Sequence, residues 1–517
     1  MPISQSNQVF NLVKSLTKAE KRNFRLYAKR IQDNGALLFL QLFDVMDKQK
    51  VLKETEILTQ LGQIGKGQFS NLKRHLYAQI IASLRMLHKE KRANFKVREY
   101  LDYAYILYGK GLYLQALKLL RKASILANKH HLIYMQLTIV EFEKTIESRH
   151  ITRSGNNKAE MLIEESALIQ RDANHLVRLS NLRIKMHGKY LQYGHVRSSK
   201  EAAEIRAYYH EQIDEINLEE LGLMERIYYV QSRVWYNYIL LDFHACIKYA
   251  IAWTDLLHRN PNMIERDVDL YMRGYHYVLT AANHIKDKET HSKYLMKFEA
   301  FREGAYGKFN TNSQILSFLY VHTGRLDNII LNGNFNLSES IIPKSLNRIR
   351  RYKFMLDDHR IMVFYFKFAW IYLGAGNISK ALRYLNKIIN NELKKLREDL
   401  QNYARILQLI CHYELGSFDI FQYLLNNNSN YFDRKSELNI FLQETMNMFN
   451  ELKSKGISDH KIVFEKYLTS FLKIKEDPYE RRAFVYLDII AWLESKVKGI
   501  SLQAVIQGKP GWTNSNR

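Results

Sequence analysis

The sequence predicts an all-α protein, and three observations support this prediction. Apolar residues recur with the spacing of a helix along most of the 517 residues, as in the stretch from Leu72 to Leu87. We find no convincing series of alternating apolar and polar residues, the pattern typical of strands. Only 5 prolines and 22 glycines are present, so long helices meet few breakers.

The first 95 residues are expected to form a compact, basic helical module. Thr17 is followed three residues later by Glu20, and this capping box predicts the start of a helix. Apolar spacing predicts further helices over 36–48, 53–61 and 69–92. Three glycines between residues 62 and 67 mark a break between the last two.

Beyond this module, pairs of helices recur around glycine-bearing turns. The residues that carry the pattern are Ala104, Gly111, Ala116, Leu120 and Ala123 in 100–123, and Ala369, Tyr372, Gly376 and Ala381 in 365–388. Both stretches resemble the tetratricopeptide repeat (TPR), in which alanines let two antiparallel helices approach and large residues fill the gaps. Gly376 and Gly416 are 40 residues apart, whereas the standard repeat has about 34 residues. We therefore expect an irregular TPR-like α-solenoid of antiparallel helical hairpins with an N-terminal helical module.

Weaker signals complete the predicted organisation. Further turns are predicted at Asp242, Gly324 and Gly416, and loops over 148–160, 331–344 and 426–435. The last helix is expected to start at Asp477 and to end before Gly499. The predicted domains are the module 1–95, helical-hairpin repeats over 96–330, TPR-like C-terminal repeats over 345–500, and a tail over 501–517.

The positive charge is concentrated near the N-terminus. Residues 1–200 contain 35 Lys and Arg against 16 Asp and Glu, and residues 201–517 contain 42 against 37. Such an asymmetry indicates an acidic partner such as nucleic acid. Two series with spacing 0, 4, 7, 11 would each share one helical face, and they are our candidate phosphate-binding residues. They are Lys18, Arg22, Arg25 and Lys29, and Arg85, Lys89, Arg92 and Lys96.

Both series have a plain alternative, because an amphipathic helix needs a solvated charged face in any case. A helix-turn-helix over 54–76 is a related hypothesis, in which Asn71, Lys73, Arg74 and His75 would be exposed for a major groove. Its turn is long and contains three glycines, which disfavours this motif.

Known catalytic and metal-binding patterns are not found. Gly109-Lys110 lacks the earlier glycine and the following Ser or Thr of a phosphate-binding loop. The sequence has no HExxH, no GxSxG and no paired cysteines, and Cys246 and Cys411 stand alone. We therefore expect no enzyme activity, no cofactor, no metal and no small-molecule substrate. The absence of a signal peptide or an apolar run of about 18 residues predicts a cytoplasmic protein without a membrane span.

The TPR resemblance implies a binding groove built from the first helix of each hairpin. At the groove positions stand Leu101, Tyr105 and Tyr108 in the first stretch, and Phe366, Trp370 and Leu373 in the second. An apolar, aromatic groove suits a hydrophobic helix or peptide, although these side chains could equally pack against neighbouring hairpins. The predicted function is a non-catalytic protein–protein interaction scaffold or adaptor. The alternative is a nucleic-acid-binding regulatory protein that uses the basic N-terminal module.

Overall fold

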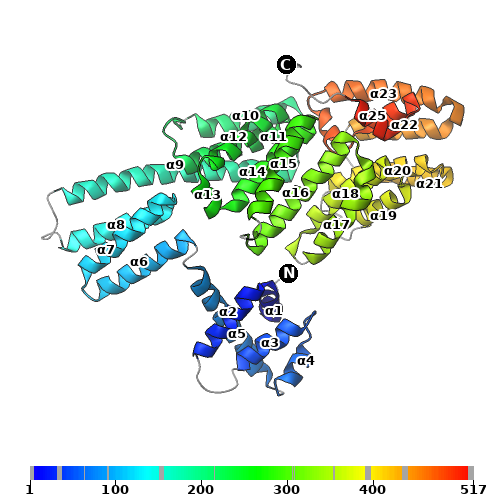
Figure 1. Ribbon diagram of the computed structural model, residues 1–517. Helices are drawn as coiled ribbons and strands as arrows, with labels where there is room; N and C mark the ends of the chain where they lie inside the picture. The colour runs from blue at the N-terminus through cyan, green and yellow to red at the C-terminus, as the bar shows by residue number, and fades with distance from the viewer. Residues whose placement is uncertain are drawn as a thin grey trace. The chain divides into compact units, whose positions relative to one another are not determined.

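The computed structural model describes residues 5–31, 38–62, 64–89, 92–150, 157–214, 216–305, 307, 309–352, 355–390, 398–433 and 440–509. These residues form α-helices and short 3-10 turns and contain no strand, so the all-α prediction is confirmed (Figure 1). The chain divides into two compact units, residues 1–173 (unit 1) and 174–517 (unit 2). The domain ends expected at residues 95 and 330 fall inside these units.

Unit 1 begins with a small bundle that has its own hydrophobic core. Its helices are α1 (Gln5–Ser15), α2 (Lys18–Ile31), α3 (Leu38–Lys48), α4 (Glu54–Gln60) and α5 (Lys66–His88). The apolar faces of α2 and α3 meet through aromatic rings, with the Phe24 and Phe43 centroids 4.7 Å apart. The predicted capping box is confirmed, because the Glu20 amide donates to Thr17 Oγ1 at 3.2 Å and the Thr17 amide donates to Glu20 Oε2 at 2.8 Å.

A second, separate core of unit 1 joins three longer helices. They are α6 (Ala93–Gly109), α7 (Tyr113–Lys129) and α8 (Ile133–His150), and α9 (Lys158–Tyr193) follows and contains the boundary between the units. Ala104 from α6 and Ala116 and Ala123 from α7 are completely buried in this core. Small side chains at these positions let the two helices pack closely, as the sequence pattern predicts.

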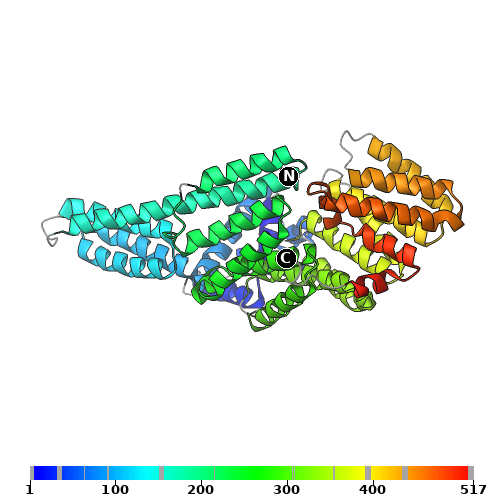
Figure 2. The same ribbon diagram turned by 90° about the horizontal axis from the view of Figure 1, so that it is seen from above.

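Unit 2 contains further helices that pack in sequence order. They are α10 (Ser199–Ile213), α11 (Leu223–Ile239), α12 (Phe243–His258), α13 (Pro261–Arg266), α14 (Val268–His284), α15 (Lys288–Ala305), α16 (Thr311–Asn332), α17 (Ser338–Arg351), α18 (Asp358–Gly374), α19 (Ile378–Ile389), α20 (Glu398–Glu414), α21 (Phe418–Asp433), α22 (Ile440–Ser454), α23 (His460–Glu476), α24 (Ile489–Lys498) and α25 (Leu502–Gly508). Short 3-10 segments occur at Phe335–Leu337, Ile457–Asp459 and Glu480–Val485. Helix pairs such as α11 with α12, α14 with α15, and α18 with α19 lie side by side in both views (Figures 1 and 2). The first helices of successive pairs also contact one another, α14 with α16, α16 with α18, and α18 with α20.

Several helix-to-helix connections in both units share one backbone geometry. A residue with positive φ ends the helix, and the amide after it donates a hydrogen bond of 2.8–3.1 Å to the carbonyl five residues earlier. The positive-φ residues of these connections are Gly111, His131, Leu241, Lys286, Gly333, Gly376, Gly416 and Gly499. Glycine adopts this conformation without strain, whereas the other three residues do so at a cost. The sequence therefore marks the glycine turns, but the connections at His131 and Lys286 carry no such signal.

The turn predicted at Gly324 is wrong. Gly324 lies inside α16, where an added Cβ atom would stand 2.9 Å from Leu279 Cδ1 and 3.2 Å from Leu295 Cδ1. The missing side chain lets α16 pack closely on α14 and α15. This glycine is present for packing and not for a turn.

The predicted loops are shorter than expected. Most of 331–344 belongs to a 3-10 turn and to α17, and residues 426–433 belong to α21. Of the loop predicted at 148–160, residues 148–150 belong to α8 and 158–160 to α9, and residues 151–156 lie outside the described residues.

The chain end also differs from the prediction. The helix expected to start at Asp477 starts at Ile489, where Asp488 accepts a hydrogen bond from the Ala491 amide at 3.2 Å. Its end before Gly499 is confirmed. Part of the expected tail forms α25, and residues 510–517 lie outside the described residues.

Candidate functional site

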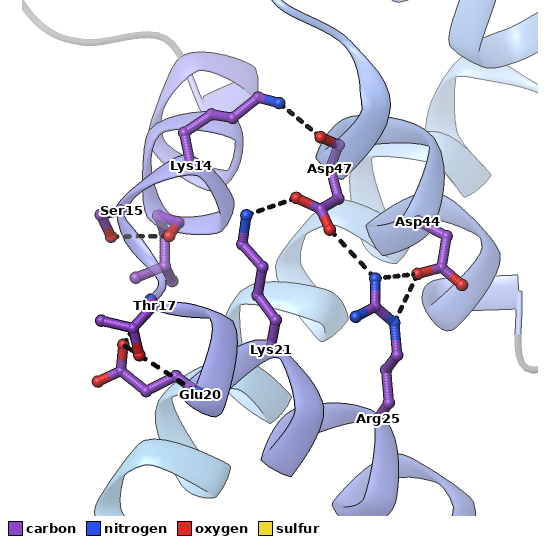
Figure 3. A network of polar contacts seen from close by, with 9 residues as sticks. Lys14, Ser15, Thr17, Glu20, Lys21, Arg25, Asp44 and Asp47 are labelled. Atoms are coloured by element: carbon purple, nitrogen blue, oxygen red, sulfur yellow. Dashed lines mark hydrogen bonds and ion pairs between the residues drawn. The ribbon is translucent and has the colours of Figure 1, made fainter. Parts of the chain in front are cut away.

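The first predicted cationic series lies on α2, and its members differ in their surroundings. Arg25 donates to Asp44 Oδ1 at 2.8 and 2.9 Å and to Asp47 Oδ2 at 3.1 Å, both on α3 (Figure 3). Lys21, on the same face, donates to Asp47 Oδ1 at 2.5 Å. These ion pairs hold α2 against α3, so the Arg25 guanidinium is already paired with carboxylates of the protein.

The other members of this series remain available to a ligand. Lys18, Arg22 and Lys29 are exposed and make no ion pair with any residue that the structure describes. The series is therefore reduced to three solvent-facing cations on one helix.

The second predicted series is not a single helical face. Helix α5 ends at His88 and α6 begins at Ala93, so Arg85 and Lys96 belong to different helices. Lys89 and Lys96 both donate to the Glu99 carboxylate, at 3.0 and 2.9 Å. These two hydrogen bonds, with a third from Tyr103, lower the pKa of Glu99 to about 2. The prediction that Arg85, Lys89, Arg92 and Lys96 share one helical face is therefore wrong, because helix α5 ends before α6 begins.

Two cations of this region face solvent. Arg85 makes a 3.2 Å ion pair with Asp102 that is exposed on both sides, and Arg92 is exposed before the first turn of α6. The helix-turn-helix hypothesis expects Lys73 to be exposed, but Lys73 is buried against the Phe69 ring and forms an ion pair with Glu54 at 3.3 Å. A buried lysine with an acidic partner is not free to enter a DNA groove.

Two of the three groove residues predicted in the first TPR-like stretch, Tyr105 and Tyr108, line a groove in unit 1. This groove (the α6/α8 groove) has a volume of about 560 Å³, and its lining consists of Tyr105, Tyr108, Leu137, Thr138, Glu141, Phe142, Thr145 and Arg149. The Tyr105 ring stacks on Phe142 at 4.0 Å, and the Tyr108 hydroxyl accepts a hydrogen bond from Arg149 Nη1 at 3.1 Å. Leu101, the third predicted member, is buried in the core beneath.

The groove residues predicted in the second stretch lie in unit 2, where Phe366 and Trp370 line a cavity of about 490 Å³. Within the described part of the chain, α9, α11, α14, α16, α18 and α20 contribute to this cavity, together with residues 484–488. The paired helices α12, α15, α17, α19 and α21 contribute no lining residue among those described. Leu373 is buried and lies outside the cavity wall.

The cavity wall combines aromatic rings with cations. The cations are Arg183, Arg273, Lys286, Arg360 and Lys367, and the carboxylates are Asp327 and Asp488. Lys367 forms an ion pair with Asp327, and Lys286 lies 3.6 Å from Asp488. Arg360 lies 3.3 Å from Asp357, at the start of α18. No motif along the sequence marks these residues, because they are dispersed over about 300 positions.

Histidines in this wall are held in their neutral form. His276 stacks on Tyr320 at 4.4 Å, and burial lowers its pKa to about 4 although Asp327 opposes the change. The His187 ring lies 4.4 Å from that of Trp235, and its pKa is lowered by burial and then by the charges of Arg273 and Arg183. At neutral pH these imidazoles add hydrogen-bonding atoms but little charge.

The described residues show no group of three His, Cys, Asp or Glu side chains arranged to hold a metal ion. Cys246 and Cys411 are buried, and burial raises the pKa of both thiols. Among the helices described, none is both long and apolar enough for a membrane-spanning segment.

Comparisons of the whole chain with protein-family models, with curated proteins and with solved structures find no match.

Proposed function

We propose that the protein is a non-catalytic interaction scaffold or adaptor built from an irregular TPR-like array of helical hairpins, and that the α6/α8 groove binds its protein partner. The observation that carries this proposal is the position of the groove. It lies between α6, which pairs with α7, and α8, which packs on the same helix α7. A TPR-like array presents its partner-binding surface at this place.

The surface chemistry of the groove supports the same function. Tyr105 is 54% exposed and lines the groove together with Tyr108, Leu137 and Phe142. Apolar and aromatic side chains that remain accessible in a groove are typical of protein–protein contact sites. A groove lined by two stacked rings and one arginine suits an apolar helix or an extended peptide.

A photo-crosslinking experiment in the source cell tests this proposal. A photoreactive phenylalanine replaces Tyr105 in one full-length protein and Ile125 in the other. Ile125 is the matched control, because it is 65% exposed on α7 and does not line the groove. We expect a discrete covalent adduct from position 105 and none from position 125. Equal adducts at both positions, or none at position 105, would refute the proposal.

The nucleic-acid alternative depends on the exposed cations of the N-terminal module, which are Lys18, Arg22, Lys29, Arg85 and Arg92. Each cation that contacts a phosphate releases counterions, so binding would weaken steeply as salt is added. The test measures binding of the full chain to duplex DNA and RNA over a salt series. Replacing all five cations with Gln should abolish binding and its salt dependence if this alternative holds. An unchanged salt dependence, or no binding at low salt, rules it out.

A further inference from the structure

The cavity of unit 2 carries more positive charge than its own acids can balance. Of its five cations, Lys367 and Lys286 have carboxylate partners in the wall, and Arg360 has Asp357 nearby. Arg183 on α9 and Arg273 on α14 have no carboxylate within 4 Å among the described residues. The guanidinium carbon of Arg183 lies 5.2 Å from the centroid of the Tyr228 ring, so its neighbour is an aromatic ring and not an acid. Both arginines can therefore still pair with an anion.

The two arginines line the same cavity from different helices. Arg183 lies on α9 and Arg273 on α14, about 90 residues apart in the chain. The same wall contains His187 and Trp235, whose ring centroids are 4.4 Å apart. Burial lowers the pKa of His187, and the charges of both arginines lower it further. The cavity therefore offers two guanidinium groups and an aromatic surface to one ligand.

Unsatisfied polar atoms in the same wall also indicate a missing ligand. Arg183 Nε and Asn283 Oδ1 are buried and have no hydrogen-bond partner. Buried polar groups are nearly always hydrogen-bonded, and an unpaired one costs free energy. An oxyanion would accept from Arg183 Nε, and a polar hydrogen of the same ligand would satisfy Asn283 Oδ1.

The size and the walls of the cavity limit the kind of ligand. Its volume of about 490 Å³ falls in the range of about 300–1,000 Å³ that small-molecule sites occupy. Trp235, Tyr277, Tyr320 and Trp370 provide aromatic surface from four different helices. Planar apolar groups stack well on such rings, and arginines prefer planar or phosphate oxyanions.

We propose that this cavity binds a small aromatic anion, whose carboxylate or phosphate group lies between Arg183 and Arg273 while its ring packs on Trp235 and Trp370. This inference goes beyond the scaffold function, which concerns the α6/α8 groove in unit 1. It also departs from the expectation of no small-molecule ligand, because the site is assembled by residues that no sequence pattern connects.

Calorimetric titration of the full chain with four probes tests the proposal. Benzoate and phenyl phosphate carry the ring and the anion, benzyl alcohol carries the ring alone, and inorganic phosphate carries the anion alone. We expect benzoate or phenyl phosphate to bind at least tenfold more tightly than either control probe, and the better of the two identifies the anionic group. Quenching of tryptophan fluorescence should accompany binding, because Trp235 and Trp370 line the site. If no probe binds at millimolar concentration, or if benzyl alcohol binds as well as benzoate and phenyl phosphate, the proposal is wrong.

Variants then locate the bound anion. Arg183→Gln and Arg273→Gln should each weaken binding of the better probe by tenfold or more. Lys185→Gln removes an exposed cation from the same helix and should leave binding unchanged. Thr280→Trp fills the cavity without changing its charge and should abolish binding. Circular dichroism and thermal unfolding verify that each variant is folded, and the comparison of neutral and anionic probes requires no variant. Unchanged binding in both arginine variants would overturn the assignment.

Discussion

The two units place their charged groups in opposite ways. Residues 1–173 carry 29 Lys and Arg against 16 Asp and Glu, and residues 174–517 carry 48 against 37. Unit 1 is therefore the more basic for its length, yet Arg25, Lys89 and Lys96 on its helix surfaces are paired with carboxylates. Unit 2 is closer to balance, yet it brings Arg183 and Arg273 into one cavity without such partners. Net charge along the chain thus does not locate an anion site, because the position of the acids decides which cations are available.

Lowering the pH should produce the largest difference between the units. Burial lowers the pKa of His195 and His276 to about 4 and of His322 to about 3, from 6.5, and the pKa of His284 falls well below 6.5. The unfolded chain therefore binds protons that the folded chain does not, and stability is lost as the pH falls below 6.5. Each histidine lowers the unfolding free energy by up to about 1.4 kcal/mol per pH unit. Peptide-resolved hydrogen exchange from about pH 7 to about pH 5 should show loss of protection in unit 2.

Unit 1 provides the contrast in the same experiment. The pKa of Glu99 is lowered from 4.5 to about 2, so its stabilising effect is present above 4.5 and disappears only as the pH falls toward 2. A His322→Asn variant cannot take up the proton, although its amide can still bond the Ser345 hydroxyl that His322 Nδ1 contacts at 2.9 Å. The variant should show a smaller pH dependence in unit 2. Equal loss of protection in the two units at mildly acidic pH would contradict the comparison.

Breaking a buried ion pair of unit 2 is the second largest expected effect. Lys367→Met leaves Asp327 without its partner, and the Asp327 side chain is only 6% exposed. We expect a loss of about 3 kcal/mol in unfolding free energy, measured by denaturant titration. The double variant Lys367→Met/Asp327→Leu should recover a large part of this loss, because it removes the buried charge as well. A single variant as stable as the wild type would show that the pair is solvated.

The turn geometry is the feature that the two units share, so equivalent substitutions should cost the same in both. Gly111→Ala in unit 1 and Gly376→Ala in unit 2 place a Cβ atom at φ values of +77° and +75°, and each should cost about 1–2 kcal/mol in unfolding free energy. Thermal unfolding of each variant measures this cost. Gly109→Ala is the control, since Gly109 is helical and open space surrounds its Cα, and it should not destabilise the protein. If Gly111→Ala left the unfolding free energy unchanged, the connection between α6 and α7 would have to rearrange in the variant.

Surface pairs of unit 1 should give the smallest effect. Arg25→Gln removes contacts to Asp44 and Asp47, but the Arg25 side chain is 39% exposed and Lys21 still pairs with Asp47. We expect Arg25→Gln to lower the unfolding free energy by less than about 1 kcal/mol in denaturant titrations, and by a smaller amount at high salt. Arg22→Gln on the same helix is the control, as Arg22 is exposed and unpaired among the described residues. A loss of unfolding free energy as large as that of Lys367→Met would contradict the expected difference between the surface ion pairs of unit 1 and the buried ion pair of unit 2.

Several elements could be predicted because the interactions that form them are local. The Thr17–Glu20 capping box, the turns at Gly111 and Gly376, and the buried Ala104 each depend on residues a few positions away. The α6/α8 groove was found in part, since Tyr105 and Tyr108 face it as the TPR resemblance implies. Its other wall, with Phe142 and Arg149, comes from a helix that no motif marked.

The errors have a common physical origin. Gly324 resembles a turn residue in sequence, yet the neighbouring Leu279 and Leu295 require a small residue inside a helix. Lys286 carries no turn signal, yet it adopts positive φ because the packing of α14 on α15 sets the connection. In both cases contacts between helices outweigh local preference.

The helical class, the helices of the N-terminal module and the turns at Gly111, Gly376 and Gly416 follow from local sequence patterns, because hydrogen bonds and caps within a helix involve only near neighbours. Which charges are neutralised and which line a common cavity depends instead on how the helices pack. Arg183, Arg273 and Trp370 are separated by about 90 positions each and meet only because α9, α14 and α18 pack around one cavity. Spatial convergence of this kind depends on packing over the whole of unit 2, so no pattern along the chain could reveal it.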